Sequence, residues 1–132
     1  MTTRSSNEGA GLPISFERRF RPWRYNVSHS ELSLRSVDGA DIIEIQFFGV
    51  MGMKLKTVYE RLDITLADGP ETAEILTFSG VPGSQTAKVR CLTLNDDSFV
   101  ACLRFSAWAR PRDTERDPSG LPQSESTLLF RG

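Results

Sequence analysis

The amino-acid sequence predicts an all-β protein, either an antiparallel β-sandwich or a closed β-barrel of about 8–9 short strands with no long helix. Apolar and polar residues alternate in two long segments, and turn residues interrupt each of them. Turn residues also recur at intervals of about 8–12 residues along most of the chain. No helical spacing of apolar residues extends beyond one turn, which argues against a helical fold.

The first of these segments, residues 30–48, turns at Asp38 and Gly39, a pair that is the strongest short-range signal for a β-hairpin. With a two-residue loop, Leu34 would face Ile43 on the opposite strand; with a four-residue loop it would face Ile45. The two registers differ by an even step, so both place the same side chains on one face. We expect this face to form one wall of a core: Leu32, Leu34, Ile43, Ile45 and Phe47.

Residues 14–28, which precede this hairpin, are predicted to be extended. Pro22 has no N–H to donate to a sheet, so it marks an edge, a bulge or a break between two short strands. Strict alternation after Pro22 would place Trp23, Tyr25 and Val27 on one face.

After the hairpin, Gly49 and Gly52 interrupt a run of alternating residues that is too long for one straight strand. We expect these glycines to bend the chain, as at a barrel corner or where a strand changes sheets. Residues 62–66 and 73–79 are predicted as two further strands, and residues 68–70 between them as a turn.

A second hairpin is predicted from residues 87–94 and 98–108, with a loop centred in the middle of residues 95–98. A symmetric loop at this point would make Cys91 and Cys102 direct cross-strand partners, close enough for a disulfide. We expect two reduced thiols in contact, because no secretion signal is recognised. The same register would form the second core wall from Leu92, Leu94, Phe99, Ala101, Leu103 and Phe105.

The two ends of the chain differ in character. Residues 1–13 are polar, and we expect them to be a disordered or loosely attached arm before a single domain of residues 14–132. Residues 110–125 form a long polar loop that is either functional or mobile. Residues 127–130 are predicted as a short strand docked into a sheet, because a free apolar tail would promote aggregation.

Composition excludes several classes of protein. The formal net charge is −1, which argues against a protein built mainly to bind nucleic acid or an anionic membrane. No apolar run approaches the roughly 20 residues of a membrane helix. We therefore expect a cytoplasmic protein that does not associate with a membrane.

Few residues suggest chemistry. His29 is the single histidine, and no G-x-S-x-G sequence accompanies it. Together with Cys91 and Cys102 it has none of the usual metal-ligand spacings, so we predict no metal and no cofactor. We interpret His29 as a structural residue. An enzyme that uses His29 with a neighbouring carboxylate is the least favoured function.

The favoured function is a non-enzymatic protein–protein interaction or self-association module. Arginines and aromatic residues are interleaved in residues 16–25, while residues 58–74 carry five acidic residues against one arginine, so the two segments could attract a partner or another copy. The same arginines and aromatics could bind single-stranded nucleic acid, which the net charge disfavours. The candidate partner-binding residues are Arg19, Arg21, Trp23, Arg24 and Tyr25.

An alternative function is a small-ligand-binding β-barrel with an apolar cavity. Methionine side chains adapt to irregular apolar surfaces, and two methionines stand beside the glycines that are expected to bend the chain. The candidate ligand-binding residues are Phe47, Met51, Met53 and Tyr59.

Overall fold

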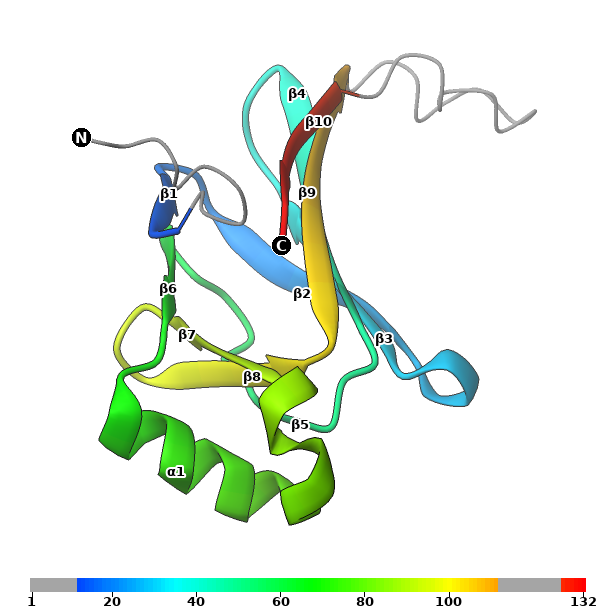
Figure 1. Ribbon diagram of the computed structural model, residues 1–132. Helices are drawn as coiled ribbons and strands as arrows, with labels where there is room; N and C mark the ends of the chain where they lie inside the picture. The colour runs from blue at the N-terminus through cyan, green and yellow to red at the C-terminus, as the bar shows by residue number, and fades with distance from the viewer. Residues whose placement is uncertain (1–11, 112–126) are drawn as a thin grey trace.

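The computed structural model describes residues 12–111 and 127–132. The chain is mostly β, with two antiparallel sheets of five strands and one short helix, which confirms the all-β class (Figure 1). The described strands form two separate sheets and not one closed barrel. Nearly all of the predicted N-terminal arm, and residues 112–125 of the predicted polar loop, lie outside the described residues.

The two sheets are built from strands that are mostly not consecutive in the sequence. Sheet A contains, in spatial order, β1 (Ile14–Phe16), β6 (Leu62–Leu66), β7 (Arg90–Leu94), β8 (Ser98–Cys102) and β5 (Gly52–Lys54). Sheet B contains β10 (Thr127–Arg131), β9 (Arg104–Pro111), β4 (Asp41–Phe48), β3 (Glu31–Ser36) and β2 (Phe20–Asn26). Helix α1 (Gly69–Ser79) and the short 3-10 helices η2 (Val27–His29) and η3 (Gly83–Lys88) complete the described elements.

The β3–β4 hairpin adopts the register of the four-residue loop, with Leu34 opposite Ile45 and Arg35 opposite Glu44. All five side chains of the predicted core wall are buried, as expected. They pack in one hydrophobic cluster with residues of sheet A such as Ile64 and Leu92, so the two sheets share a core.

The chain changes sheets at the predicted glycines. Strand β4 belongs to sheet B and β5 to sheet A, and Gly49 between them has φ of +67°, a conformation that favours glycine. Gly52 allows a close approach, because a Cβ atom there would overlap the side chain of Ser79 at the end of α1. The predicted terminal strand is also confirmed, since β10 pairs with β9 at the edge of sheet B.

The strand predicted over residues 73–79 is wrong, because this segment is the C-terminal part of α1. The Asp68 side chain accepts a hydrogen bond of 2.8 Å from the Glu71 N–H, and the Glu71 carboxylate accepts one of 3.2 Å from the Asp68 N–H. This reciprocal capping box starts the helix, and Gly80 ends it with φ of +68°. The expectation that no helix exceeds one turn is also wrong, because α1 contains 11 residues.

The predicted register of the second hairpin is also wrong. Leu94 pairs with Ser98, so the loop has three residues and Cys91 faces Ala101, not Cys102. A one-residue shift moves every later side chain to the other face of the sheet. Cys91 therefore packs toward α1 while Cys102 points into the core between the sheets, and both are free thiols. The two cysteines cannot form the expected pair.

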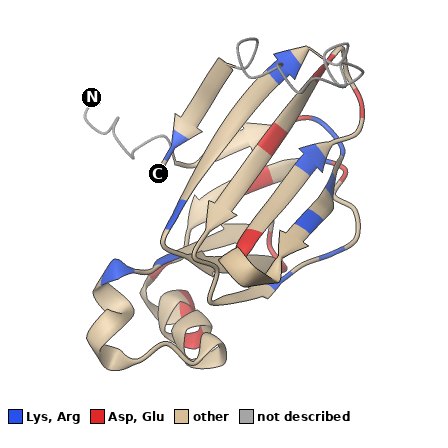
Figure 2. Cartoon of the chain, turned by 90° about the vertical axis from the view of Figure 1, so that its right-hand side faces the viewer, with Lys and Arg blue, Asp and Glu red and all other residues tan. Residues whose placement is uncertain are grey.

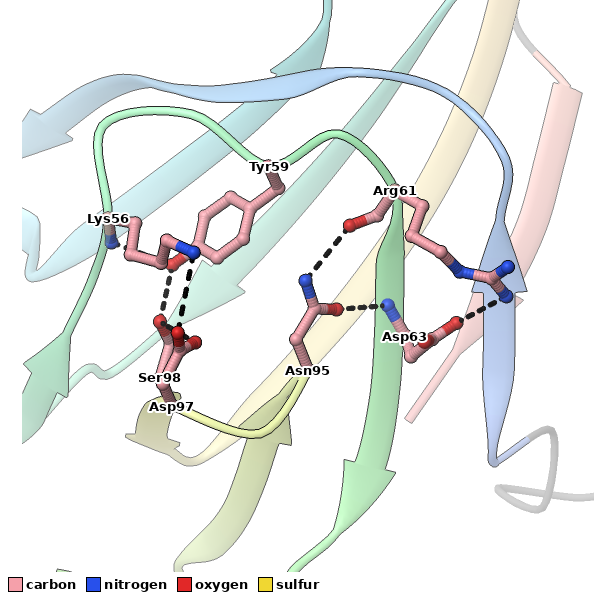
Figure 3. A network of polar contacts seen from close by, with 7 residues as sticks. All are labelled: Lys56, Tyr59, Arg61, Asp63, Asn95, Asp97 and Ser98. Atoms are coloured by element: carbon pink, nitrogen blue, oxygen red, sulfur yellow. Dashed lines mark hydrogen bonds and ion pairs between the residues drawn. The ribbon is translucent and has the colours of Figure 1, made fainter.

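Contacts with a distant strand explain this loop. Asn95, in a left-handed conformation with φ of +57°, accepts a hydrogen bond of 2.8 Å from the Asp63 N–H through its side-chain oxygen (Figure 3). Its side-chain nitrogen donates to the Arg61 carbonyl at 3.0 Å. At the other end of the loop, the Tyr59 hydroxyl donates to the Ser98 hydroxyl at 2.8 Å. Residues 59–63 thus hold the loop at both ends, through the backbone of Arg61 and Asp63 and through the side chain of Tyr59.

Burial suppresses the reactivity of both thiols. It raises the pKa of Cys102 to about 12 and also raises the pKa of Cys91. Both groups therefore remain protonated at neutral pH, and a protonated thiol is a poor nucleophile.

Candidate functional site

The candidate site is the outer face of sheet B, the side that points away from the shared core, which we call the Arg–Trp face. The strand register identifies its residues, because directly opposed residues point to the same side of a sheet. It carries two glutamates, Glu31 and Glu44, and therefore a formal surplus of four positive charges. Its six arginines are Arg21, Arg24, Arg35, Arg104, Arg110 and Arg131.

A row of small polar residues crosses the middle of this face. Ser33 on β3 is opposite Gln46 on β4, and Gln46 is opposite Ser106 on β9. Arg24 on β2 and Arg131 on β10 pair with the two ends of the row, and both arginines are exposed. The two serines are buried, and exposed arginines lie at both ends of this row.

The next row holds a shielded cluster of charges. The Glu44 carboxylate lies 3.4 Å from Nη2 of Arg35 and 3.0 Å from Nη1 of Arg110. The side chains are only 13–17% exposed, which is low for charged groups on the outside of a sheet. Ion pairs that are shielded from water are stronger than exposed ones, so this cluster holds its three side chains in fixed positions.

Aromatic rings lie beside arginines of this face. The Trp23 ring stacks on the Arg35 guanidinium at 4.3 Å, and the Phe48 ring lies 4.6 Å from the guanidinium of Arg104. Trp108 donates a hydrogen bond of 3.0 Å from its indole N–H to the Ser106 hydroxyl. Such contacts orient the rings while leaving them accessible, and Trp23 is 51% exposed.

The structure brings together three of the five predicted partner-binding residues: Arg21, Trp23 and Arg24. A β-bulge between Pro22 and Arg24 inserts Trp23 as an extra residue, as Pro22 had suggested. Tyr25 then pairs with the core residue Leu32 and points to the other side of β2, so the expectation that Trp23 and Tyr25 share a face is wrong.

The other two predicted partner-binding residues, Arg19 and Tyr25, lie elsewhere. Arg19 precedes β2 and makes an exposed ion pair with Glu60 at 3.1 Å, while Tyr25 is exposed on the core side of the β2 edge. No observation tests the binding role of any of the five residues, which remains a prediction.

The predicted ligand-binding residues do not gather at one surface. Phe47 and Tyr59 are buried in the shared core at 0% and 1% exposure. Met53 is half-buried on β5, against that core, and Met51 is half-buried just before β5. A ligand-binding role for these four residues remains a prediction.

Sequence reasoning missed most of the Arg–Trp face, because its remaining residues come from segments far from residues 16–25. The outward positions of Arg35 and Glu44 follow from the alternation of the first hairpin, because each residue is a neighbour in the sequence of core-wall residues that point inward. The contribution of β9 and β10 had no signal in the sequence, because it depends on which strands become neighbours.

Other kinds of site find little support. In residues 12–111 and 127–132, no group of three or more His, Cys, Asp and Glu residues could hold a metal ion. His29 is exposed at the end of η2. The described part of the chain contains no helix with the length and apolar character needed to span a membrane.

The chain matches no family model, no curated protein and no solved structure.

Proposed function

We propose that this chain is a non-enzymatic binding domain, built as a two-layer β-sandwich, whose Arg–Trp face binds an acidic segment of a protein partner. The observation that carries the proposal is the concentration of charge. One face holds a formal surplus of four positive charges, although the chain as a whole has a net charge of −1. Such segregation promotes and orients the approach of an oppositely charged partner.

The side chains of the face suit a protein surface. Tryptophan and arginine are enriched among the residues that dominate binding energy at protein interfaces. The guanidinium groups of the exposed residues Arg24, Arg104 and Arg131 can each donate two hydrogen bonds to one carboxylate. Trp23 is already stacked on Arg35, so little conformational entropy is lost when a partner covers it.

Single-stranded nucleic acid is the competing ligand. A phosphate backbone that crossed the centre of the face would meet the carboxylate of Glu44. The affinity of a protein for a phosphate backbone depends on the number of phosphates that it neutralises, and here two of the arginines are already paired with Glu44. We therefore expect a carboxylate-bearing polypeptide to bind more tightly.

Tryptophan fluorescence can test this proposal with two defined probes, a random copolymer of glutamate and tyrosine and an oligo-dT. At about 150 mM salt, we expect the copolymer to change the fluorescence and to bind at least about tenfold more tightly than oligo-dT. Arg24→Glu combined with Arg104→Glu should weaken copolymer binding at least about tenfold.

The matched control is Lys88→Glu combined with Arg90→Glu, which makes the same charge change with exposed residues outside the Arg–Trp face. Equal losses in the two double variants would show that net charge, and not this face, determines binding. Tighter binding of oligo-dT, or no binding of the copolymer, would also overturn the proposal.

A further inference from the structure

The outer side of sheet A carries a groove with the opposite character. It has a volume of about 450 Å³ and lies between helix α1 and the β7–β8 hairpin. Its apolar wall is formed by Ile75, Phe78 and Phe99. The rings of Phe78 and Phe99 meet edge to face at 5.2 Å between centroids, and Phe78 is 65% exposed. An aromatic ring this exposed is available to a binding partner.

Carboxylates line the groove from both sides. Glu71 and Glu74 come from α1, while Asp96 and Asp97 come from the loop between β7 and β8. Lys54 is the basic residue among those that line the groove, and α1 contains no Lys or Arg, as the red bands in Figure 2 illustrate. We call this surface the acidic groove.

The acidic groove and the Arg–Trp face have complementary chemistry. A guanidinium group can bind carboxylates through its fork of N–H donors while its plane stacks on an aromatic ring. The Arg–Trp face presents exposed arginines beside Trp23, and the acidic groove presents carboxylates beside Phe78. Each surface offers the groups that the other would bind.

We propose that a second copy of this chain places its Arg–Trp face against the acidic groove, so that copies associate head to tail. This inference rests on the proposed function and names another copy as an acidic partner. Within one molecule the two surfaces cannot meet, because α1 packs on sheet A and the Arg–Trp face is the far side of sheet B (Figure 1). A net charge of −1 adds little repulsion between copies.

Head-to-tail contact is heterologous, so a dimer keeps one free Arg–Trp face and one free acidic groove, and growth can continue past the dimer. Sedimentation velocity over a range of concentrations should therefore show species larger than a dimer. The association constant should fall at least about tenfold between low and high salt, since the contact is mainly ionic.

Two double variants test the geometry. The groove variant carries Glu74→Lys and Asp96→Lys, and the face variant carries Arg24→Glu and Arg104→Glu. All four positions are exposed, and neither variant changes the capping residues Asp68 and Glu71. Thermal unfolding of each variant verifies that it is folded.

Either variant alone should remain a monomer, because each lacks one of the two required surfaces. An equimolar mixture should associate, because the intact face of the groove variant can bind the intact groove of the face variant. Association of either variant alone as strongly as the wild type, or a mixture that stays monomeric, would overturn the inference.

The same proteins distinguish this inference from the proposed function. The groove variant keeps its Arg–Trp face, so it should bind the glutamate–tyrosine copolymer at least as well as the wild type. A wild type that stays monomeric but binds the copolymer would refute self-association and leave the proposed function standing. A wild type that self-associates without binding the copolymer would refute the broader proposal.

Discussion

The outer faces of the two sheets differ although their inner faces are alike. Both inner faces contribute aliphatic and aromatic residues to one core. On the outside of sheet A, Cys91 and Ala101 pack against Ile75 of α1 and form a second, smaller apolar cluster. On the outside of sheet B, arginines, tryptophans and Glu44 take the corresponding positions.

This difference shows how the outward residues determine what a sheet can bind. Small apolar side chains on sheet A allow a helix to approach closely and exclude water, which stabilises the fold. Charged and aromatic side chains on sheet B satisfy one another in pairs, so this face needs no covering helix to be stable. The part of sheet A beneath α1 contributes to stability, and the outer face of sheet B is the one that carries the proposed function.

The largest difference in the free energy of unfolding should be found between a substitution in the core and a substitution on the Arg–Trp face. Phe47→Ala removes a fully buried ring and should lower the free energy of unfolding by about 3–5 kcal/mol. Trp23→Ala removes a half-exposed ring stacked on Arg35 and should cost no more than about 1 kcal/mol. Urea denaturation measures both, and similar losses would mean that the Arg–Trp face is structural.

A smaller effect should come from the shielded charges on sheet B. Glu44→Gln keeps the shape of the side chain but leaves Arg35 and Arg110 without their carboxylate, which should cost about 1–3 kcal/mol. Glu60→Gln removes the partner of Arg19 from an exposed pair and should cost less than about 1 kcal/mol. If the two losses in urea denaturation were equal, the cluster would not be shielded as described.

The stability of α1, the helix that covers sheet A, should depend on its N-terminal capping residue, Asp68. Asp68→Ala removes the hydrogen bond to the Glu71 N–H and should cost about 1 kcal/mol in thermal unfolding, whereas Asp96→Ala should cost little. Loosening α1 should also speed the reaction of Cys91 with a thiol reagent, while Cys102 stays protected in the shared core. Equal acceleration at both cysteines would contradict the placement of Cys91 under the helix.

The smallest effect should be the pH dependence of an exposed site on sheet A. A hydrogen bond from Ser15, and then the interaction with Arg61, lower the pKa of Asp63 below its ordinary value of 3.8. A lowered folded-state pKa stabilises the fold above the unfolded pKa, and this contribution is lost as the pH falls through the folded value.

The difference in free energy of unfolding between the wild type and Asp63→Asn should therefore be constant near neutral pH and shrink below about pH 4. This difference in free energy of unfolding should be smaller than the loss caused by Asp68→Ala, because solvent screens the interactions of Asp63. Urea denaturation at several pH values measures it. A difference that grew toward acid would show that the sign of the pKa shift is wrong.

The sequence by itself determined the β3–β4 hairpin, its core face and the bend of the chain at Gly49 and Gly52. These features depend on local rules, since side chains alternate along a strand and glycine allows a positive φ. The start of α1 was also present locally, in Asp68 and Glu71. The pattern of residues 73–79 suggested a strand, but the same apolar residues, Ile75, Leu76 and Phe78, also fit a short helix. In the structure this helix packs Ile75 on sheet A.

Tertiary structure alone decided the register of the second hairpin and the composition of the Arg–Trp face. The three-residue loop depends on the hydrogen bonds between Asn95 and the backbone of Arg61 and Asp63, at the start of the distant strand β6. The Arg–Trp face depends on β9 and β10 joining β2, β3 and β4 in one sheet. Neighbouring residues encode the period of a strand, but the partners of a strand are chosen by burial and hydrogen bonding between segments that are distant in the sequence.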